Sequence, residues 1–524
     1  MTPMMEQYFE IKEQYKDFLL FYRLGDFYEM FFDDAIVASR ELELTLTGRA
    51  CGEAERAPMC GVPFHSSEGY IGRLIEKGFK VAICEQTEDP ALAKGLVKRE
   101  VVRVITPGTL IETNLLSEQK NNYLCALYMG EFEYGVCFAD ISTAQVYATT
   151  FDGSNMDARL RNELGTYAPR EILCNLKKAN MGEIGDFIAS QKGMMLTDGQ
   201  GARFDFAASR GLVQNQFGEQ IRGEVLENKA LVLAVGAVLS YLLDTEKSDI
   251  SYIKELNVYS DGQYLEMDIN TRRNLELTES MRTKEKKGSL LWVLDKTQTA
   301  PGARMLRKWV EHPLLNTSAI VRRQGAVEEL CGSFMLREEL AEALSHVLDL
   351  ERLITRIVYG SANGKDLRAV SNTASVLPEV RELLASCKSE ELRRICEELY
   401  PLTDVCEAIT RAIKEDPPFS LREGGIIADG YNKDVDYLRS VMSDGKGWLE
   451  KLAEEEREKT GIKTLKVNYN KVFGYYIEVT KSLIGQVPDR YIRKQTLSGC
   501  ERYITQELKD LEGTILGAAD KICA

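Results

Sequence analysis

The spacing of apolar residues changes twice along this chain of 524 residues, and the change constrains the fold more than any other feature. Up to about residue 255, runs with the two-residue period of strands mix with runs at the three- and four-residue spacing of helices. Helical spacing dominates from about 265 to 445, and the two-residue period returns in 464–480. The pattern predicts a multidomain protein in which a small β unit is inserted between long helices.

We place domain boundaries where the pattern changes. The predicted segments are a mixed α/β domain at 1–115, a compact α/β domain at 116–255, a helical region at 256–448, a small β domain at 449–505 and a helix at 506–524. In the first domain we expect a hairpin at Gly25-Asp26, a helix at 33–42, a loop through Ser67, a helix at 70–77 and two later strands. A strand meander opens the second domain. Further along we expect helical rods at 265–445, a solvated charged helix at 449–463, a hairpin turning at 470–474 and helix again at 491–522.

Composition excludes several classes of protein. The formal net charge is -15, with 44% hydrophobic and 28% charged residues, as in soluble globular proteins. No apolar run reaches the roughly 18 residues of a membrane span, and the N-terminus lacks the basic and apolar regions of a signal peptide. We therefore expect a cytoplasmic protein without membrane contact. The 12 cysteines lack CxxC spacing and the 3 histidines lie far apart, so we expect free thiols, mostly in cores, and no metal site.

The hairpin FYRLGDFYEMF at 21–31 is the most informative short segment. Side chains two apart on a strand share a face, so Phe27 and Glu29 should point one way and Tyr28 and Met30 the other. An aromatic ring near a hairpin tip can act as a wedge between stacked bases. The alternative is that Phe27 belongs to the core and Glu29 is solvated, and the pattern alone favours this alternative.

The sequence offers no local enzyme motif. It lacks a GxxxxGK[ST] phosphate-binding loop, a GxSxG turn, an HExxH pair and the kinase motifs. A carboxylate metal nuclease would need paired acids, and the strands of the second domain offer only Asp140. We therefore expect no bond chemistry and no cofactor from this chain.

Two stretches are basic within an acidic chain. Residues 94–103 hold four cations against one acid, Glu100, a balance of +3. Residues 463–505 hold eight cations against three acids, a balance of +5, with asparagines and tyrosines among them. Such stretches suit contacts to phosphates and sugars without base reading. The alternatives are a solvated basic face and a packed hairpin.

Three groups of long segments carry a resemblance to a known family. The first comprises GDFYEMF, APMCGVPFHSSEGYIGRLIEKGFKVAICEQTEDP and VVRVITPGT. The second comprises MDINTRRNLELTES and LLWVLDKTQTAPGARMLRKWVEHPL, and the third GIIADGYNKDVDYLR, EKTGIKTLKVNYNKVFGYYIEVT and YIRKQTLSGCERYITQELKDLE. In this order they resemble the mismatch-recognition domain, the core or lever, and the clamp with the returning lever of MutS, a bacterial family of DNA mismatch-repair proteins.

The resemblance implies a role for each segment. It makes 1–115 the mismatch-recognition domain, 116–255 a ribonuclease-H-like connector, 256–448 the all-α core or lever, 449–505 the clamp and 506–524 the returning lever helix. The family also has a C-terminal ATPase domain, which uses ATP, ADP and Mg, and a helix-turn-helix; we expect both to be absent here. Implied partners are mismatched duplex DNA, a MutL-like protein and, in full-length members, a second copy. The implied location is cytoplasmic and associated with the bacterial nucleoid.

The resemblance also implies site residues. The Phe-x-Glu element of the family falls on Phe27 and Glu29, which would stack on and hydrogen-bond the mispaired base while the DNA bends. Other DNA contacts expected in the first domain are Gln86, Lys94, Lys98, Arg99 and Arg103. Contacts expected in the clamp are Lys466, Asn468, Asn470, Lys471, Tyr476, Lys481, Arg493 and Lys494. No catalytic or metal-binding residue is implied in this chain.

Two alternatives from other classes stay open. A non-enzymatic helical scaffold that binds a protein partner would fit the acidic total and the expected absence of the ATPase domain. Steep, salt-dependent binding to duplex DNA would exclude such a scaffold. A structure-specific nuclease using the second domain would require magnesium-dependent cleavage, and the lone Asp140 argues against it.

Overall fold

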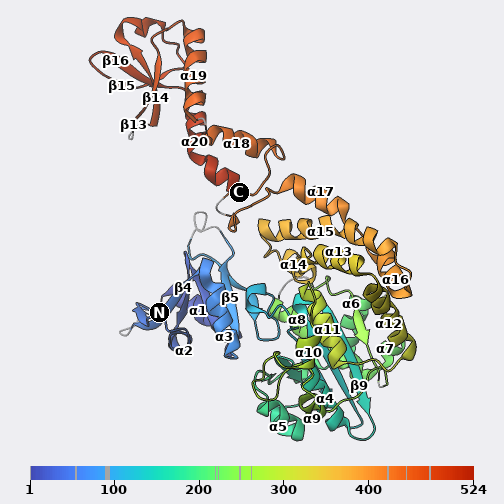
Figure 1. The fold of residues 1–524 in the computed structure, drawn as a ribbon. Coiled ribbons are helices and arrows are strands. Elements are labelled where there is room, and N and C mark those ends of the chain that lie inside the picture. The colour runs from blue at the N-terminus through green and yellow to red at the C-terminus, as the bar shows by residue number, and fades with distance from the viewer. Residues whose placement is uncertain are drawn as a thin grey trace. The chain divides into compact units, whose positions relative to one another are not determined.

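The computed structural model describes residues 2–52, 56–88, 95–218, 220–221, 223–246, 250–260, 262–421, 424–443, 445–470 and 474–523. The chain divides into two units, one formed by Met1–Ser361 with Val376–Pro401 and the other by Ala362–Ser375 with Leu402–Ala524 (Figure 1). Each unit is described by itself below. None of the helices in the described ranges is long and apolar enough to cross a membrane.

The first sheet has the strand order β3-β4-β2-β1-β5-β6. Its strands are β1 (Leu19–Leu24), β2 (Phe27–Phe31), β3 (Thr47–Arg49), β4 (Ala57–Pro63), β5 (Val81–Gln86) and β6 (Arg99–Ile105). Helices α2 (Phe32–Leu42) and α3 (Ser67–Glu76) bury apolar side chains against one face, and α1 (Pro3–Gln14) buries Met5 and Tyr8 against the other. The predicted hairpin is confirmed, because β1 and β2 pair antiparallel around Gly25-Asp26.

The loop predicted through Ser67 was wrong for β3 and β4. The glycines and prolines that indicated a loop lie within paired strands, with Pro58 opposite Gly48 and Gly61 opposite Glu29. A Cβ atom at Gly61 would lie 3.2 Å from the carbonyl oxygen of Tyr28. The glycine therefore marks a close approach of two backbones, which a reading of turn residues alone does not detect.

The second sheet has the order β11-β10-β7-β8-β9-β12. The predicted meander is confirmed as β7 (Leu124–Met129), β8 (Glu133–Asp140) and β9 (Gln145–Asp152). The strands β10 (Glu171–Cys174) and β11 (Met195–Thr197) extend it in parallel beyond β7, and β12 (Leu256–Val258) does so beyond β9. The apolar helix α8 (Lys229–Glu246) packs on one face, where Gly135 leaves no room for a Cβ atom beside Ala230.

The other helices of this region are α4 (Met156–Tyr167), α5 (Glu183–Ser190), α6 (Phe206–Phe217) and α7 (Gly223–Glu227). Helices α4 and α5 cover the face of the second sheet opposite α8.

The segment from 265 to 445 is helical, but its helices are shorter than the predicted rods. They are α9 (Ile269–Asn274), α10 (Leu290–Leu294), α11 (Ala300–Glu311), α12 (Thr317–Gly332), α13 (Phe334–Ser345), α14 (Leu350–Val358), α15 (Gly364–Ala385), α16 (Glu390–Glu398), α17 (Thr403–Ala412) and α18 (Lys433–Ser443). Local capping explains the breaks: Asp349 accepts a hydrogen bond from the backbone N–H of Arg352 and begins α14. Glu329 accepts from the N–H groups of Lys388 and Ser389 just before α16.

The third sheet, in the second unit, has the order β13-β14-β16-β15. The predicted hairpin is confirmed as β13 (Lys466–Asn470) and β14 (Gly474–Thr480). The helix predicted at 491–522 was wrong at its start, where β15 (Ile492–Thr496) and β16 (Cys500–Ile504) form a second hairpin. Leu497-Ser498-Gly499 make the short, glycine-containing turn between them, and only α20 (Gln506–Cys523) is helical.

The charged helix α19 (Gly445–Thr460) packs against this sheet through Leu449 and Ala453. The prediction that it is simply solvated was wrong for Glu456, whose side chain is fully buried. Its Oε2 accepts hydrogen bonds from Arg490 and Tyr491, each 2.6 Å away. Burial alone would raise the pKa of Glu456, but these two hydrogen bonds hold it below its usual value.

Candidate nucleic-acid interface

The tip of the β1–β2 hairpin carries an exposed aromatic ring. Gly25 has φ 58° at the first position of the two-residue turn, which suits a type II′ hairpin. The N–H of Phe64, after β4, donates to the carbonyl of Asp26 and fixes the turn. Phe27 follows immediately and its side chain is 46% exposed, although an apolar ring this large is usually buried.

The side chains of β2 alternate as predicted. Phe27 is exposed and Glu29 half-buried on one face, while Tyr28 and Met30 are buried in the core on the other. The core alternative for Phe27 is therefore not what the structure shows. Gly61 lies opposite Glu29 on β4, so no side chain of that strand covers the carboxylate.

Glu29 has a partner that the sequence analysis missed. The guanidinium of Arg49, on β3, donates to Glu29 Oε2 at 2.6 Å, and the Arg49 side chain is itself 39% exposed. The pair places a compensated carboxylate beside the exposed ring. The sequence analysis did not predict Arg49 as the partner of Glu29, because it assigned the segment that contains Thr47-Gly48-Arg49 to a loop.

The opposite face of the hairpin is braced. Tyr28 donates to Glu85 on β5, and Arg23 forms a 3.4 Å ion pair with the same carboxylate. The Arg23 guanidinium also lies 3.6 Å from the centroid of the Phe64 ring. These contacts fix both strands of the hairpin on the face opposite the exposed ring of Phe27.

The basic residues predicted around 94–103 have different environments. Lys98 is exposed and pairs with Glu100 at 2.6 Å, and Arg103 pairs with Glu112 at 2.6 Å. Arg99 is buried and donates to the carbonyls of Arg23 and Val97 and to Gln7, so a phosphate contact would require breaking these bonds. Lys94 lies outside the described residues.

Gln86 ends β5 and shares a face with Cys84, which is buried on the α1 side of the sheet. This is the face that carries Phe27, Glu29 and Tyr22, since Tyr22 lies opposite Glu29 and beside Cys84. The structure thus brings Gln86 to the face of the exposed ring. Arg103 lies opposite Ile83 and therefore on the other face of the sheet.

The outer face of the third sheet carries a row of polar side chains. Lys466 lies opposite Glu478, Glu478 opposite Arg502, and Arg502 opposite Gln495, so the row crosses all four strands. Arg502 donates to Gln495 at 2.8 Å and covers the ring of Tyr476 with its guanidinium 4.4 Å from the ring centroid. Tyr476 is consequently buried, and Arg502 takes the surface position that was predicted for Tyr476.

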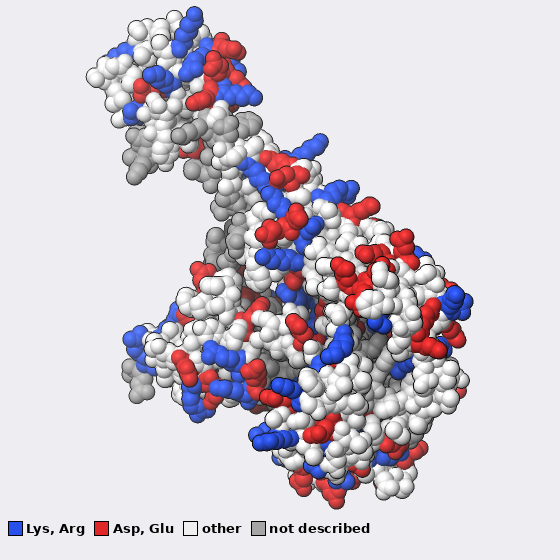
Figure 2. Space-filling view, viewed as in Figure 1, with Lys and Arg blue, Asp and Glu red and all other residues white. Residues whose placement is uncertain are grey.

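The remaining predicted residues of this sheet are mostly exposed. Lys466, Asn468, Lys481 and Lys494 are exposed, and Arg493 is exposed while pairing with Glu501 at 3.4 Å. In this part of Figure 2 acidic side chains gather over α19, whereas the sheet is mainly white and blue. Lys471 lies outside the described residues, as does the side chain of Asn470. The arrangement offers a cationic surface on an open sheet.

Asp140, the only carboxylate considered for a nuclease, already accepts hydrogen bonds from groups within the protein. It ends β8, and its two oxygens accept from the side chain of Asn121, the N–H of Asn122, and the N–H and hydroxyl of Ser142 at 2.7–3.1 Å. A carboxylate used to fasten a linker and cap a turn has no geometry for metal-assisted hydrolysis.

Comparison with known proteins gives a consistent family. Residues 2–114 match MutS domain I, residues 122–254 match MutS domain II and residues 270–514 match MutS domain III. A DNA mismatch repair protein MutS from Ruminiclostridium cellulolyticum is 52% identical over 521 residues, and one from Acetivibrio thermocellus is 51% identical over 525 residues. The alignments cover 99% and 100% of this chain and 60% of each relative, so the chain spans about 60% of the length of the curated relatives it matches. Since three consecutive domains of one family match in order and these relatives share half of its residues, the chain belongs to the MutS family.

Proposed function

We propose that this chain recognises mispaired or unpaired bases in duplex DNA by inserting Phe27 as a wedge, while the third sheet contacts the DNA backbone. The observation that carries the proposal is the half-exposed phenylalanine at the tip of a braced hairpin, in a domain that matches MutS domain I. Because the hairpin is already held in place, insertion of this ring between bases does not require ordering of the strand that carries it.

Discrimination would come from the deformability of the DNA. A mispaired step costs less to unstack and kink than a matched step, so a wedge binds it more tightly without reading its sequence. Glu29 would hydrogen-bond the displaced base. Its pairing with Arg49 supports this, because a compensated carboxylate repels neighbouring phosphates less than a bare one.

The third sheet would supply sequence-independent affinity. The residues proposed for contacts to phosphates and sugars are the exposed Lys466, Asn468, Lys481, Arg493 and Lys494, together with the partly buried Arg502. We leave out the buried Tyr476 and, in the first domain, the buried Arg99. Amides and cations that alternate on an open sheet suit backbone positioning rather than base reading.

Further features of the family are proposed at the level of domains. The strand order of the second sheet, an antiparallel meander extended by two parallel strands beyond its first strand, supports a ribonuclease-H-like connector. Residues 256–448 would form the core or lever, with 449–505 as the clamp and 506–524 as the returning lever helix. The proposed partners are mismatched DNA, a MutL-like protein and a second copy, and the proposed location is cytoplasmic. The role proposed for this chain is binding, without bond chemistry.

The test is binding of this chain to a duplex with one G·T mispair and to its matched counterpart, across a salt series. We expect tighter binding to the mispaired duplex, and loss of that preference in Phe27→Ala. Base–aromatic stacking contributes about 1–3 kcal/mol, so affinity for the mispaired duplex should fall by about 5- to 150-fold. Phe132→Ala is the matched control, because Phe132 is 77% exposed between β7 and β8.

Each alternative predicts a different result. Equal, salt-sensitive binding to both duplexes would keep the backbone contacts and contradict the wedge. Absence of binding at low salt would contradict the proposal as a whole and favour the helical scaffold. Magnesium-dependent cleavage of either duplex would support the nuclease instead.

A further inference from the structure

Three neighbouring cavities in the first unit share His312, the residue that follows α11. Its ring lies between Tyr167 and Tyr264, with centroids 5.2 and 5.4 Å away. The side chain is 93% buried, and neither ring nitrogen has a hydrogen-bond partner among the described residues. Burial lowers the pKa of His312 to about 3, so the ring is neutral and keeps one N–H to donate.

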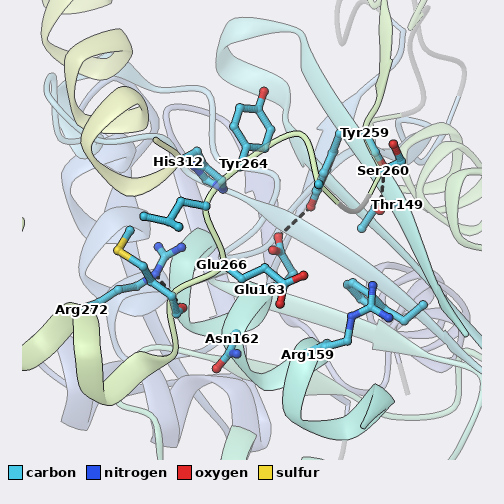
Figure 3. A pocket seen from close by; sticks show the side chains of 14 residues that line it. Thr149, Arg159, Asn162, Glu163, Tyr259, Ser260, Tyr264, Glu266, Arg272 and His312 are labelled. Atoms are coloured by element: carbon cyan, nitrogen blue, oxygen red, sulfur yellow. Dashed lines mark hydrogen bonds between the residues drawn. The ribbon is translucent and has the colours of Figure 1, made fainter. Parts of the chain in front are cut away.

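The cavity shown in Figure 3 is lined by charges of both signs, the cations Arg159 and Arg272 and the acids Glu163 and Glu266. Glu163 and Tyr259 are joined there by a 2.7 Å hydrogen bond, with His312 and Tyr264 at one side. The Nε of Arg272 donates to the carbonyl of Met267 at 3.2 Å. Burial raises the pKa of Glu163 and thereby favours its uncharged form. This cavity is explained by contacts within the protein.

The adjoining cavity is larger and strongly basic. It has a volume of about 410 Å³, and its only acids among the described lining residues are Glu279 and Glu311. The lining cations are Lys120, Arg170, Lys192, Arg304, Arg307 and Lys308. Three of these six are neutralised, namely Lys120 by Glu279 at 2.7 Å, Arg307 by Glu311 at 3.4 Å and Arg304 by Asp349 at 2.7 Å.

The other three cations have no counter-charge. Within the described part of the chain, no carboxylate oxygen lies within 4.0 Å of Arg170, Lys192 or Lys308. They come from separate elements, since Arg170 precedes β10, Lys192 follows α5 and Lys308 belongs to α11. The ammonium of Lys308 lies 3.5 Å from the centroid of the Tyr147 ring, and burial lowers its pKa to about 8.

Uncompensated positive charge at a partly enclosed site raises the free energy of the folded protein, and a bound anion would remove that cost. We propose that this cavity binds a phosphate-bearing anion, held by Arg170, Lys192 and Lys308 and by the N–H of neutral His312. Several oxygens on one phosphorus atom can accept from donors supplied by different elements, and the Arg170 guanidinium suits such an anion with two parallel hydrogen bonds. The volume lies within the range of about 300–1000 Å³ that small-ligand sites occupy.

The proposal does not depend on DNA binding by the hairpin or the third sheet, and its test uses no DNA. Calorimetric titration of the full chain with inorganic phosphate, pyrophosphate and ATP should show saturable binding of at least one of them. Stronger binding of ATP would identify a nucleotide as the source of the phosphate, and equal or stronger binding of the inorganic anions would identify a free oxyanion. Binding of none at millimolar concentration would overturn the proposal.

Two variants test the residues. Lys308→Met and Arg170→Met should each weaken binding about tenfold or more, whereas Lys308→Arg should retain it. Lys254→Met is the control, since Lys254 is exposed and does not line the cavity. Lys308→Met and Arg170→Met each relieve repulsion between cations of the cavity. Their melting temperatures without ligand should therefore equal or exceed that of the parent, which separates lost binding from lost folding. Unchanged affinity in both methionine variants would contradict the proposed site.

Discussion

The hairpin of the first sheet and the outer face of the third sheet expose opposite kinds of chemistry. The hairpin presents the ring of Phe27, and two cations of the first domain are paired with acids, Arg49 with Glu29 and Lys98 with Glu100. On the third sheet Lys466, Lys481 and Lys494 are exposed with no carboxylate in ion-pair distance among the residues described. Under the proposed function, the first surface would respond to mispairing and the second to the charge of the DNA backbone, so mispairing and salt should affect them separately.

Each of the two units contains a fully buried glutamate that joins separate elements, but the two glutamates differ in the number of groups that bind their carboxylates. Glu171 on β10 pairs with Lys80 at 3.1 Å and accepts from Thr106, Thr197, Tyr241 and the N–H of Gly108. Burial alone would raise the pKa of Glu171, but Lys80 and these hydroxyls hold it below its usual value. Glu456 has Tyr491 and a half-exposed Arg490. Glu171 joins two sheets, and Glu456 fastens a sheet to a helix.

Glu171→Gln should give the largest effect. The substitution keeps the shape but leaves Lys80 without its counter-charge, and breaking a buried ion pair costs on the order of 3 kcal/mol. We expect a loss of this size in the free energy of unfolding of the first unit, measured by urea denaturation. Glu183→Gln is the control, because Glu183 is exposed and forms only a 3.4 Å surface pair with Arg161. Equal stability of the two variants would show that Glu171 is not a stabilising element.

Glu456→Gln tests the second glutamate through its pH dependence. A carboxylate whose pKa is lowered by folding stabilises the protein above its ordinary pKa, about 4.3, and this contribution is lost as the pH falls through the lowered value. The parent third sheet should therefore lose stability on acidification, and the variant should lose less. At neutral pH we expect a cost of about 1–2 kcal/mol, because Arg490 can turn to solvent while Tyr491 loses its acceptor. Amide exchange in β13–β16 measures both effects, and an unchanged acid dependence would contradict the assignment.

The sequence predicted the hairpin more completely than its surroundings. Gly25-Asp26 between alternating runs specifies a two-residue turn, so the placing of Phe27 and Tyr28 on opposite faces followed from local rules. The exposure of Phe27 did not, because the pattern alone favoured a position in the core. Arg49 could not be predicted as the partner of Glu29, because β3, which carries Arg49, lies in the segment that was predicted to be a loop. The strands at 492–504 were also missed, since the pairing of β16 with β14 and of β15 with β16 decides their structure and local spacing does not.

The cations of residues 463–505 show a second limit of prediction from sequence. The positive balance of 463–505 was visible in the sequence, but which cations are free was not. Arg490 is used internally by Glu456, and Arg502 covers Tyr476. Likewise Arg99 looked like its neighbour Lys98, yet lies buried under Tyr22 and bonded to Arg23. Charge counting gives the sign of a surface, whereas packing decides which charges reach it.

Removal of two free lysines should separate the surfaces. For the double variant Lys466→Ala with Lys494→Ala, we expect affinity for matched and mispaired duplexes to fall equally, by about tenfold, while the preference between them is kept. The slope of log affinity against log salt should become shallower by about 2, because each lysine neutralises about one phosphate. Lys433→Ala on α18 serves as the control, because this exposed lysine lies outside the sheet. A selective loss for the mispaired duplex would contradict the division of roles.

The smallest effect, and the finest test of the comparison, concerns the pair of Arg49 and Glu29. As a partly exposed ion pair it contributes about 0–1 kcal/mol to stability, so Arg49→Gln should scarcely change unfolding. Its consequence should appear in DNA binding, because the variant leaves an uncompensated carboxylate beside the wedge. We expect affinity for both duplexes to fall several-fold at low salt and to recover as salt screens the repulsion.

A double-mutant cycle assigns this loss to the pair. If Arg49 acts by compensating Glu29, adding Glu29→Gln to Arg49→Gln should restore affinity for the matched duplex, because the repelling charge is gone. The mispaired duplex should recover less, since the displaced base also loses its carboxylate acceptor. If the two substitutions weaken matched binding additively, Arg49 contacts phosphate directly, and the hairpin then uses free charge just as the third sheet does.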